Sequence, residues 1–156
     1  MKNRVWIVIG FLLLPGYARS QLPWSASEID RAKNHVLIVD LGAEVRQGIR
    51  LEKTVRHGRE AYFASVVVDR AALRTMPITK KIFYERYLSF RNQFISPKAK
   101  TLPSNVCRLT LRVTKRTDRA PASHDSLCLE AMPKTEKAKL NAWYRSTLSM
   151  IQHSSY

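Results

Sequence analysis

The chain has 156 residues, of which 27 are lysine or arginine and 12 are aspartate or glutamate, giving a formal net charge of +15. Because 45% of the residues are hydrophobic, the chain can bury a core and is not expected to be disordered throughout. Two cysteines exclude a disulfide-dense scaffold and a four-thiolate zinc site. The length suits a single domain.

The first 20 residues have the three parts of a secretory signal peptide. Lys2 and Arg4 are basic, residues 5–14 carry no charge, and Ala18 and Ser20 place small side chains at the two positions that a signal peptidase recognises. Ten apolar residues span about 15 Å as a helix, about half of a bilayer core, so an uncleaved anchor is the poorer alternative. We expect residues 1–20 to be removed, leaving one globular domain over residues 21–156 with 24 basic and 12 acidic residues.

The domain is expected to begin with a short helix, followed by a segment that could be either strand or helix. Ser25 and Glu28 have the spacing of a capping box, which predicts a short helix from about residue 26 to residue 34. Residues 36–41 are apolar and β-branched, so they fit either a buried strand or a continuation of the helix.

A hairpin is predicted next. Residues 44–55 alternate between polar and apolar types, which is typical of a half-buried strand. The inward side chains of this strand are expected to be Val45, Ile49, Leu51 and Val55. Gly58 supplies the positive φ angle that a turn at residues 56–59 needs, and residues 61–69 return as an apolar, central strand.

The second half of the chain predicts a helix over residues 78–95, a loop over 96–105, a strand over 106–115, a return strand over 127–131 and a helix over 133–152. One aromatic stripe recurs at helical spacing in the first of these helices, and we interpret it as core rather than as a ligand site: Phe83, Tyr87, Phe90 and Phe94. The predicted fold class is therefore α+β, an antiparallel sheet of four to five strands with two main helices packed on one face, in the order (α)βββαββα.

Cys107 and Cys128 are the only two cysteines, and an exported protein meets an oxidising compartment. They stand at the outer ends of a predicted hairpin, so we expect them to form a disulfide. If they face each other directly, the apolar residues of the two strands fall on opposite faces. A bulge, or one strand buried on both faces, would resolve that conflict.

Catalytic motifs are few. Residues 123–126 read Ser-His-Asp-Ser, but a catalytic triad is assembled from separated segments, and adjacent residues do not readily point at one centre. No histidine pair has metal-ligand spacing, and there is no nucleophile elbow or phosphate-binding glycine loop. We therefore expect no cofactor and no metal. Enzyme activity is unsupported, although paired carboxylates leave no local motif.

The basic residues are better organised. Arg46 and Arg50 share the outward face of one strand, and Arg108 and Arg112 share that of another. Such a face suits an anionic polymer or an acidic protein. The alternative is a solvated face whose charge only keeps the protein soluble. The candidate binding residues are Arg46, Arg50, Lys98, Lys100, Arg108, Arg112, Lys115 and Arg116.

The expected export of the protein bears on whether its anionic partner is a nucleic acid. Nucleic acid is the usual partner of a strongly basic domain, but it is unlikely to be the ligand of an exported protein. The sequence thus predicts a non-enzymatic binding protein, inhibitor-like or envelope-associated, in the periplasm or outside the cell. The alternatives are a small exported hydrolase acting on envelope material and a structural subunit of a surface assembly.

Overall fold

A computed structural model describes residues 26–42, 46–69, 71–94, 107, 109–119 and 121–153. Its elements, in chain order, are α1 (Ala26–Arg31), β1 (His35–Gly42), β2 (Gln47–Arg56), β3 (Arg59–Val68), β4 (Ala71–Ile78), α2 (Lys80–Phe94), β5 (Thr110–Thr117), β6 (Ser123–Cys128) and α3 (Lys134–His153). The predicted signal peptide, the capping serine Ser25 and the predicted loop over residues 96–105 lie outside the described residues.

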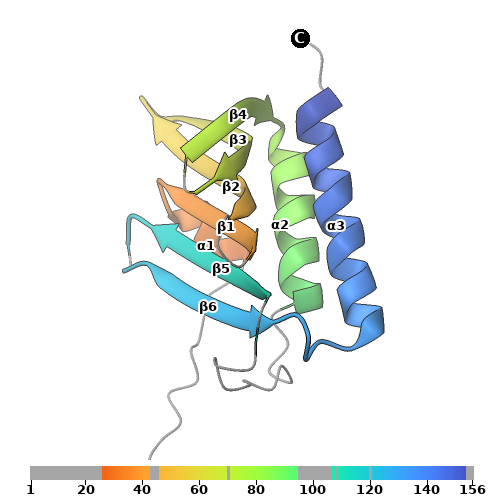
Figure 1. Ribbon diagram of the computed structural model, residues 1–156. Coiled ribbons are helices and arrows are strands. Elements are labelled where there is room, and N and C mark those ends of the chain that lie inside the picture. Colours follow the sequence, from red (N-terminus) through yellow and green to blue (C-terminus); the bar gives the residue numbers. More distant parts are fainter. Residues whose placement is uncertain are drawn as a thin grey trace, which may run out of the picture.

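The strands form one twisted antiparallel sheet in the order β4-β3-β2-β1-β5-β6. Helices α2 and α3 lie side by side along one face of this sheet (Figure 1). The α+β class, the antiparallel sheet and the two main helices on one face are therefore as predicted. None of the helices in these ranges is long and apolar enough to cross a bilayer.

The sheet has one strand more than the four to five predicted. The additional strand is β4, which pairs with β3 alone and forms one edge of the sheet. Its sequence does not alternate, and Met76-Pro77 resembles an interruption of the chain. An edge strand tolerates proline because one side of its backbone has no partner to bond, and this is why a strand passes through Pro77.

The central strands set the inward row of side chains. Residues 35–42 form a strand, which settles the choice left open by the sequence. In the register of β1 with β2, Leu37 lies opposite Leu51 and Val39 opposite Ile49, and all four are fully buried. Cross-strand partners point to the same face, so this row faces the helices.

The helices complete the core with aromatic side chains. Phe83, Tyr87 and Phe90 of α2 are fully buried, which confirms the core interpretation of the aromatic stripe for these three residues. Trp143 of α3 packs against Phe90 with ring centroids 4.9 Å apart, and its indole N–H donates to a backbone carbonyl of α2 at 3.0 Å. This bond satisfies the one polar group of a buried indole.

The predicted turn of the first hairpin is also present. His57 and Gly58 connect β2 and β3, with φ angles of 50° and 74°. Two successive residues of positive φ match the right-handed twist of a two-residue hairpin. The next turn is held by Asp69, whose carboxylate accepts a hydrogen bond from the Arg46 backbone N–H at 3.0 Å.

Candidate functional site

The face of the sheet opposite α2 and α3 carries several of the predicted binding residues, and we call it the arginine face. Arg50 on β2 lies opposite Ile38 on β1, and Ile38 lies opposite Thr114 on β5. Arg112 is two residues from Thr114 and therefore points to the same side. The members of the arginine face are Arg46, Arg50, Arg56, Arg112 and Arg116, together with two carboxylates, Asp40 and Glu52.

Two of these arginines are partly engaged. Arg50 forms an ion pair of 2.6 Å with Glu52, and Arg46 Nη2 donates to Thr110 Oγ1 at 3.1 Å. The Nη1 of Arg46 and the Nε of Arg50 are buried and have no hydrogen-bond partner among the described atoms. Even with Asp40 and Glu52 included, the face keeps an excess of positive charge.

Other predicted binding residues are placed elsewhere. Lys115 of β5 lies opposite Leu37, so it points toward the helices and is buried instead of joining Arg112 and Arg116. Lys98, Lys100 and Arg108 lie outside the described residues.

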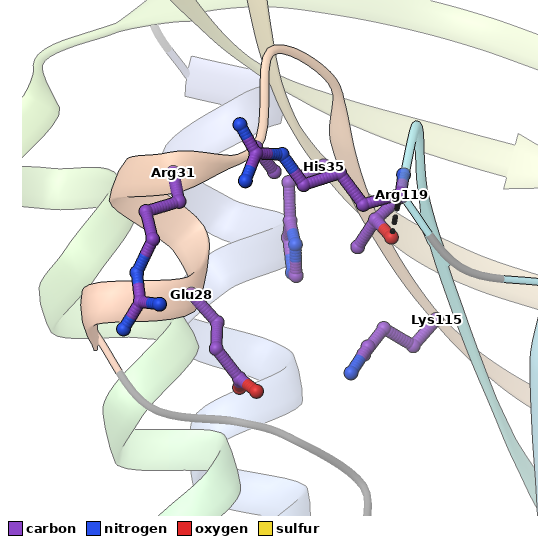
Figure 2. Close-up of a pocket in the computed structure, with 7 residues that line it drawn as sticks. Glu28, Arg31, His35, Lys115 and Arg119 are labelled. Atoms are coloured by element: carbon purple, nitrogen blue, oxygen red, sulfur yellow. Dashed lines mark hydrogen bonds between the residues drawn. The ribbon is translucent and has the colours of Figure 1, made fainter.

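A second candidate site is a pocket on the helix side of the sheet, between α1 and the end of β5. Its volume is about 160 Å³. Figure 2 shows the His35 ring pointing into the space between Glu28 and Lys115, while the Arg119 side chain extends over that ring toward α1. The lining residues are Glu28, Arg31, Ala32, His35, Lys115, Thr117 and Arg119.

His35 is the most constrained group of this pocket. Its side chain is 0% exposed, and its Nε2 lies 2.7 Å from the Tyr87 hydroxyl oxygen. Its Nδ1 is buried and has no partner among the described residues. Burial, followed by repulsion from Lys115 and Lys53, lowers the pKa of His35 to about 4, so the ring is neutral near pH 7.

The charges around the ring are mostly positive. Arg31, Lys115 and Arg119 line the pocket with one carboxylate, that of Glu28. Burial lowers the pKa of Lys115, and the nearby Glu28 carboxylate opposes that shift. The pocket therefore combines a desolvated ammonium group with a buried neutral imidazole.

The two cysteines form the predicted disulfide, with Cα atoms 5.6 Å apart. The register conflict is resolved because Cys128 lies opposite Thr110, three residues beyond Cys107, so that Leu111 can pair with Leu127. Accordingly the return strand is Ser123–Cys128 and not residues 127–131. Closing a loop of 21 residues is worth about 3 kcal/mol in the loop-entropy account.

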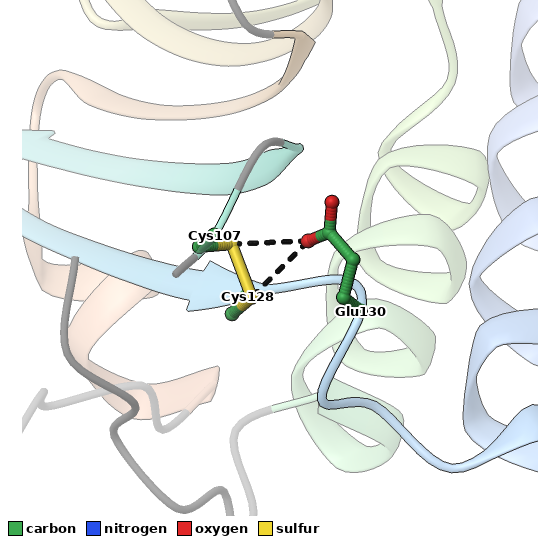
Figure 3. A group of neighbouring side chains, drawn as sticks. All are labelled: Cys107, Cys128 and Glu130. Atoms are coloured by element: carbon green, nitrogen blue, oxygen red, sulfur yellow. Dashed lines mark hydrogen bonds between the residues drawn. A yellow bond between two sulfur atoms is a disulfide. The ribbon is translucent and has the colours of Figure 1, made fainter. Parts of the chain in front are cut away.

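Glu130 lies against this disulfide (Figure 3). Its Oε2 is 3.2 Å from both sulfur atoms, and its Oε1 accepts a hydrogen bond from the Leu109 backbone N–H at 3.0 Å. Cys107, Cys128 and Glu130 are close enough together to hold a metal ion. However, disulfide sulfurs are not thiolates, so this trio is a structural staple rather than a ligand set.

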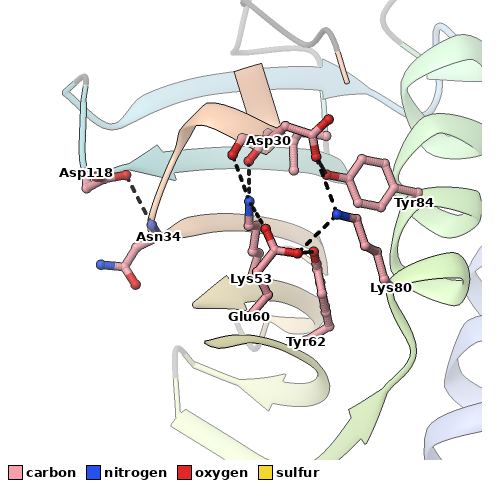
Figure 4. Close-up of polar contacts among 9 residues, drawn as sticks. Asp30, Asn34, Lys53, Glu60, Tyr62, Lys80, Tyr84 and Asp118 are labelled. Atoms are coloured by element: carbon pink, nitrogen blue, oxygen red, sulfur yellow. Dashed lines mark hydrogen bonds and ion pairs between the residues drawn. The ribbon is translucent and has the colours of Figure 1, made fainter. Parts of the chain in front are cut away.

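A third polar cluster surrounds Lys53, which is 0% exposed (Figure 4). Its Nζ donates to the backbone oxygens of Ile29 at 2.9 Å and Asp30 at 3.1 Å, and it pairs with Glu60 at 3.1 Å. The two carbonyls belong to the last turn of α1, whose C-terminal end favours a cation. All three protons of the ammonium group thus have an acceptor.

Glu60 extends the Lys53 cluster to the surface. Its Oε2 accepts hydrogen bonds from the Tyr62 hydroxyl at 2.7 Å and from Lys80 Nζ at 3.0 Å. These two bonds, and the bond from Lys53, lower the pKa of Glu60 to about 2. Tyr84 closes the cluster by donating its hydroxyl proton to Asp30. The network joins α1, β2, β3 and α2.

Sequence reasoning did not identify the pocket or the Lys53 cluster, although a signal for both is present. Lys53 follows Ile49 and Leu51 at a spacing of two, and Lys115 follows Leu111 and Val113 in the same way. A lysine that extends an inward row is a candidate for burial. What the sequence does not show is that His35 lies beside both lysines.

Comparison of the chain with protein-family models, with curated proteins and with solved structures finds no match.

Proposed function

We propose that this protein is an exported, non-enzymatic binding protein that recognises an anionic polymer or an acidic protein through its arginine face. The observation that carries the proposal is the strand register. It puts the outward arginines of β2 and β5 on one face of the sheet, separated by β1. Strands are about 4.8 Å apart, so positive charges recur at roughly 10 Å across this face.

An extended anionic polymer suits such a face better than a compact acidic ligand. Arg112 and Arg116 are four residues apart on one strand, roughly 13 Å, and Arg50 is two strands away. Guanidinium groups bind carboxylate, phosphate and sulfate groups by paired hydrogen bonds. The disulfide supports export, because disulfides persist in oxidising compartments, and we place the mature protein in the periplasm or outside the cell.

The alternatives are a hydrolase of envelope material and a subunit of a surface assembly. The lining of the pocket contains one carboxylate, that of Glu28. Hydrolysis of a glycosidic bond uses two carboxylates on either side of the scissile bond. Binding is accordingly the function that we put forward.

The test uses heparin and polyglutamate as probes, one sulfated and one carboxylated. Their affinity for the protein is measured between about 0.05 and 0.5 M NaCl, a range over which electrostatic binding weakens strongly. We expect the double variant Arg112→Gln, Arg116→Gln to bind more weakly, and its slope of log affinity against log salt to fall by about two.

The matched control removes the same charge from α3, on the other side of the sheet, with Lys139→Gln and Arg145→Gln. Both of these residues are exposed. Equal loss of affinity in the two double variants would mean that net charge, and not the arginine face, binds the polymer. Affinity that does not change with salt would also contradict the proposal.

A further inference from the structure

The pocket between α1 and β5 holds the one buried histidine of the described chain, and it lies on the opposite side of the sheet from the arginine face. We propose that this pocket binds the oxyanion group of a small ligand, a carboxylate or a phosphate or sulfate group, with His35 Nδ1–H as a buried hydrogen-bond donor and Lys115 and Arg119 as the charged partners. This site is independent of the proposed polymer-binding function and uses different residues.

The proposed role of His35 requires the neutral tautomer in which the Tyr87 hydroxyl donates to Nε2 and the ring proton lies on Nδ1. Burial raises the pKa of Tyr87, so its hydroxyl keeps its proton. When Tyr87 donates this proton to Nε2 across 2.7 Å, the neutral ring must carry its own proton on Nδ1. The Nδ1–H group is then a buried donor without an acceptor among the described residues.

A buried donor without an acceptor is costly to a protein, by about 1–3 kcal/mol. Ligand-binding sites are one place where such a cost is found, because the ligand supplies the missing acceptor. Figure 2 shows the ring directed into the pocket, with the Lys115 side chain reaching in from β5 below it. An acceptor atom placed there accepts a hydrogen bond from Nδ1–H.

The charge of the pocket selects an anion. Three cationic side chains line it against one carboxylate, and none of the lining residues is a second acid. Burial and then repulsion from Lys115 and Lys53 lower the pKa of His35, whereas burial alone lowers the pKa of Lys115. A bound anion offsets this repulsion, whereas a bound cation adds to it.

The size of the pocket limits the ligand. A volume of about 160 Å³ holds a carboxylate, phosphate or sulfate group and a short attached chain, but not a length of polymer. Arg119 is exposed at the rim, and its backbone N–H donates to Thr117 Oγ1 at 3.3 Å. Its guanidinium group therefore extends from a loop end that is tied back to β5.

The test titrates the purified protein with sodium acetate, inorganic phosphate or sodium sulfate, at an ionic strength kept constant with sodium chloride. Nitrogen-15 NMR of the histidine rings is the readout. We expect the free protein to show the Nδ1–H form of His35, and we expect saturable shifts of the His35 ring. Because Arg119 is exposed at the rim, Arg119→Gln should weaken binding about five-fold, the loss of one solvent-screened ion pair.

The matched control is Arg145→Gln, which removes the same charge from an exposed position on α3. We expect it to leave the affinity unchanged within about two-fold, since the exposed charge acts only at long range. Saturation by acetate supports the proposal and assigns a carboxylate ligand, while tighter saturation by phosphate or sulfate supports it and assigns an ester.

Two outcomes would overturn the proposal. One is the absence of saturable shifts at His35 with all three anions. The other is equal weakening by Arg119→Gln and Arg145→Gln, which would indicate binding by net charge alone. Because heparin binding is tested with Arg112 and Arg116, either proposed site can fail without the other.

Discussion

Two buried lysines lie on the two strands that flank β1: Lys53 of β2 lies opposite His35, and Lys115 of β5 lies opposite Leu37. Both extend an inward apolar row, and both lie within reach of His35, whose pKa each of them lowers. Their surroundings differ. Lys53 donates to two carbonyl oxygens and one carboxylate, whereas Lys115 faces a pocket open to solvent.

Lys53 thus belongs to a structural cluster, whereas Lys115 belongs to the proposed anion-binding pocket. A buried ammonium group with three acceptors in place needs no ligand, and it ties α1 to the sheet. The buried His35 ring beside the desolvated Lys115 can still take a ligand, because its Nδ1 has no hydrogen-bond partner among the described residues.

Lys53→Met should destabilise the protein by about 3 kcal/mol, because one buried and one part-buried carbonyl oxygen of α1 lose their donor and Glu60 loses a partner. Methionine keeps most of the aliphatic volume, so the loss reports the ammonium group. Urea unfolding followed by circular dichroism measures it.

Lys115→Met is the matched variant on the other strand. Burial disfavours the charged form of Lys115, so its removal should change the free energy of unfolding by less than about 1 kcal/mol. If the two substitutions cost the same, the distinction between the two lysines is wrong.

Because the pKa of His35 is lowered in the folded chain, we expect the free energy of unfolding to fall in mild acid. Its pKa is about 4 in the folded chain against 6.5 in the unfolded chain. Between these values the unfolded chain binds a proton that the folded chain does not, so stability falls as the pH drops from 6.5 to 4. The total is about 3 kcal/mol, at about 1.4 kcal/mol per pH unit.

Substitution of His35 by glutamine isolates this contribution. The variant retains a polar group beside Tyr87 but does not titrate, so its unfolding free energy should depend less on pH between 6.5 and 4 than that of the native chain. Parallel pH profiles for the two proteins would show that burial does not lower the pKa of His35.

We expect Glu60 to cause a smaller loss of unfolding free energy in stronger acid. Its pKa of about 2 lies below the ordinary 4.5, so its contribution is present above about pH 4.5 and is lost as the pH falls toward 2. The carboxylate is about one-third exposed, and solvent screening limits the contribution to about 1 kcal/mol. Acid unfolding of Glu60→Gln, which should lack this step, provides the measurement.

The sequence predicts the class of fold well where side-chain periodicity is strong. The aromatic stripe of α2 and the alternation in β2 each identify an element and its buried face. Periodicity does not identify β4, because an edge strand does not need an alternating pattern and can contain a proline such as Pro77. Hydrophobic patterns therefore describe the middle of this sheet better than its edge.

The candidate sites are harder to predict, because each depends on strand register. Arg50 and Arg112 share a face only because β1 pairs with β2 on one side and with β5 on the other. His35 and Lys115 are 80 positions apart in the chain, and no local pattern relates them. The sequence predicts which strand faces carry charge, but not which residues meet.

The smallest expected effect concerns Lys80, at the exposed end of the Lys53 cluster. It lies 3.0 Å from Glu60 and 3.9 Å from Asp30, and its own side chain is about half exposed. Because exposed ion pairs contribute little, Lys80→Ala should cost about 0.5–1 kcal/mol. Its neighbour Lys81 has one ion pair within the described ranges, with Glu85 at 3.9 Å, so Lys81→Ala should cost less than about 0.5 kcal/mol. If Lys80→Ala instead costs as much as Lys53→Met, the cluster depends on its exposed cation, and burial is not what makes Lys53 important.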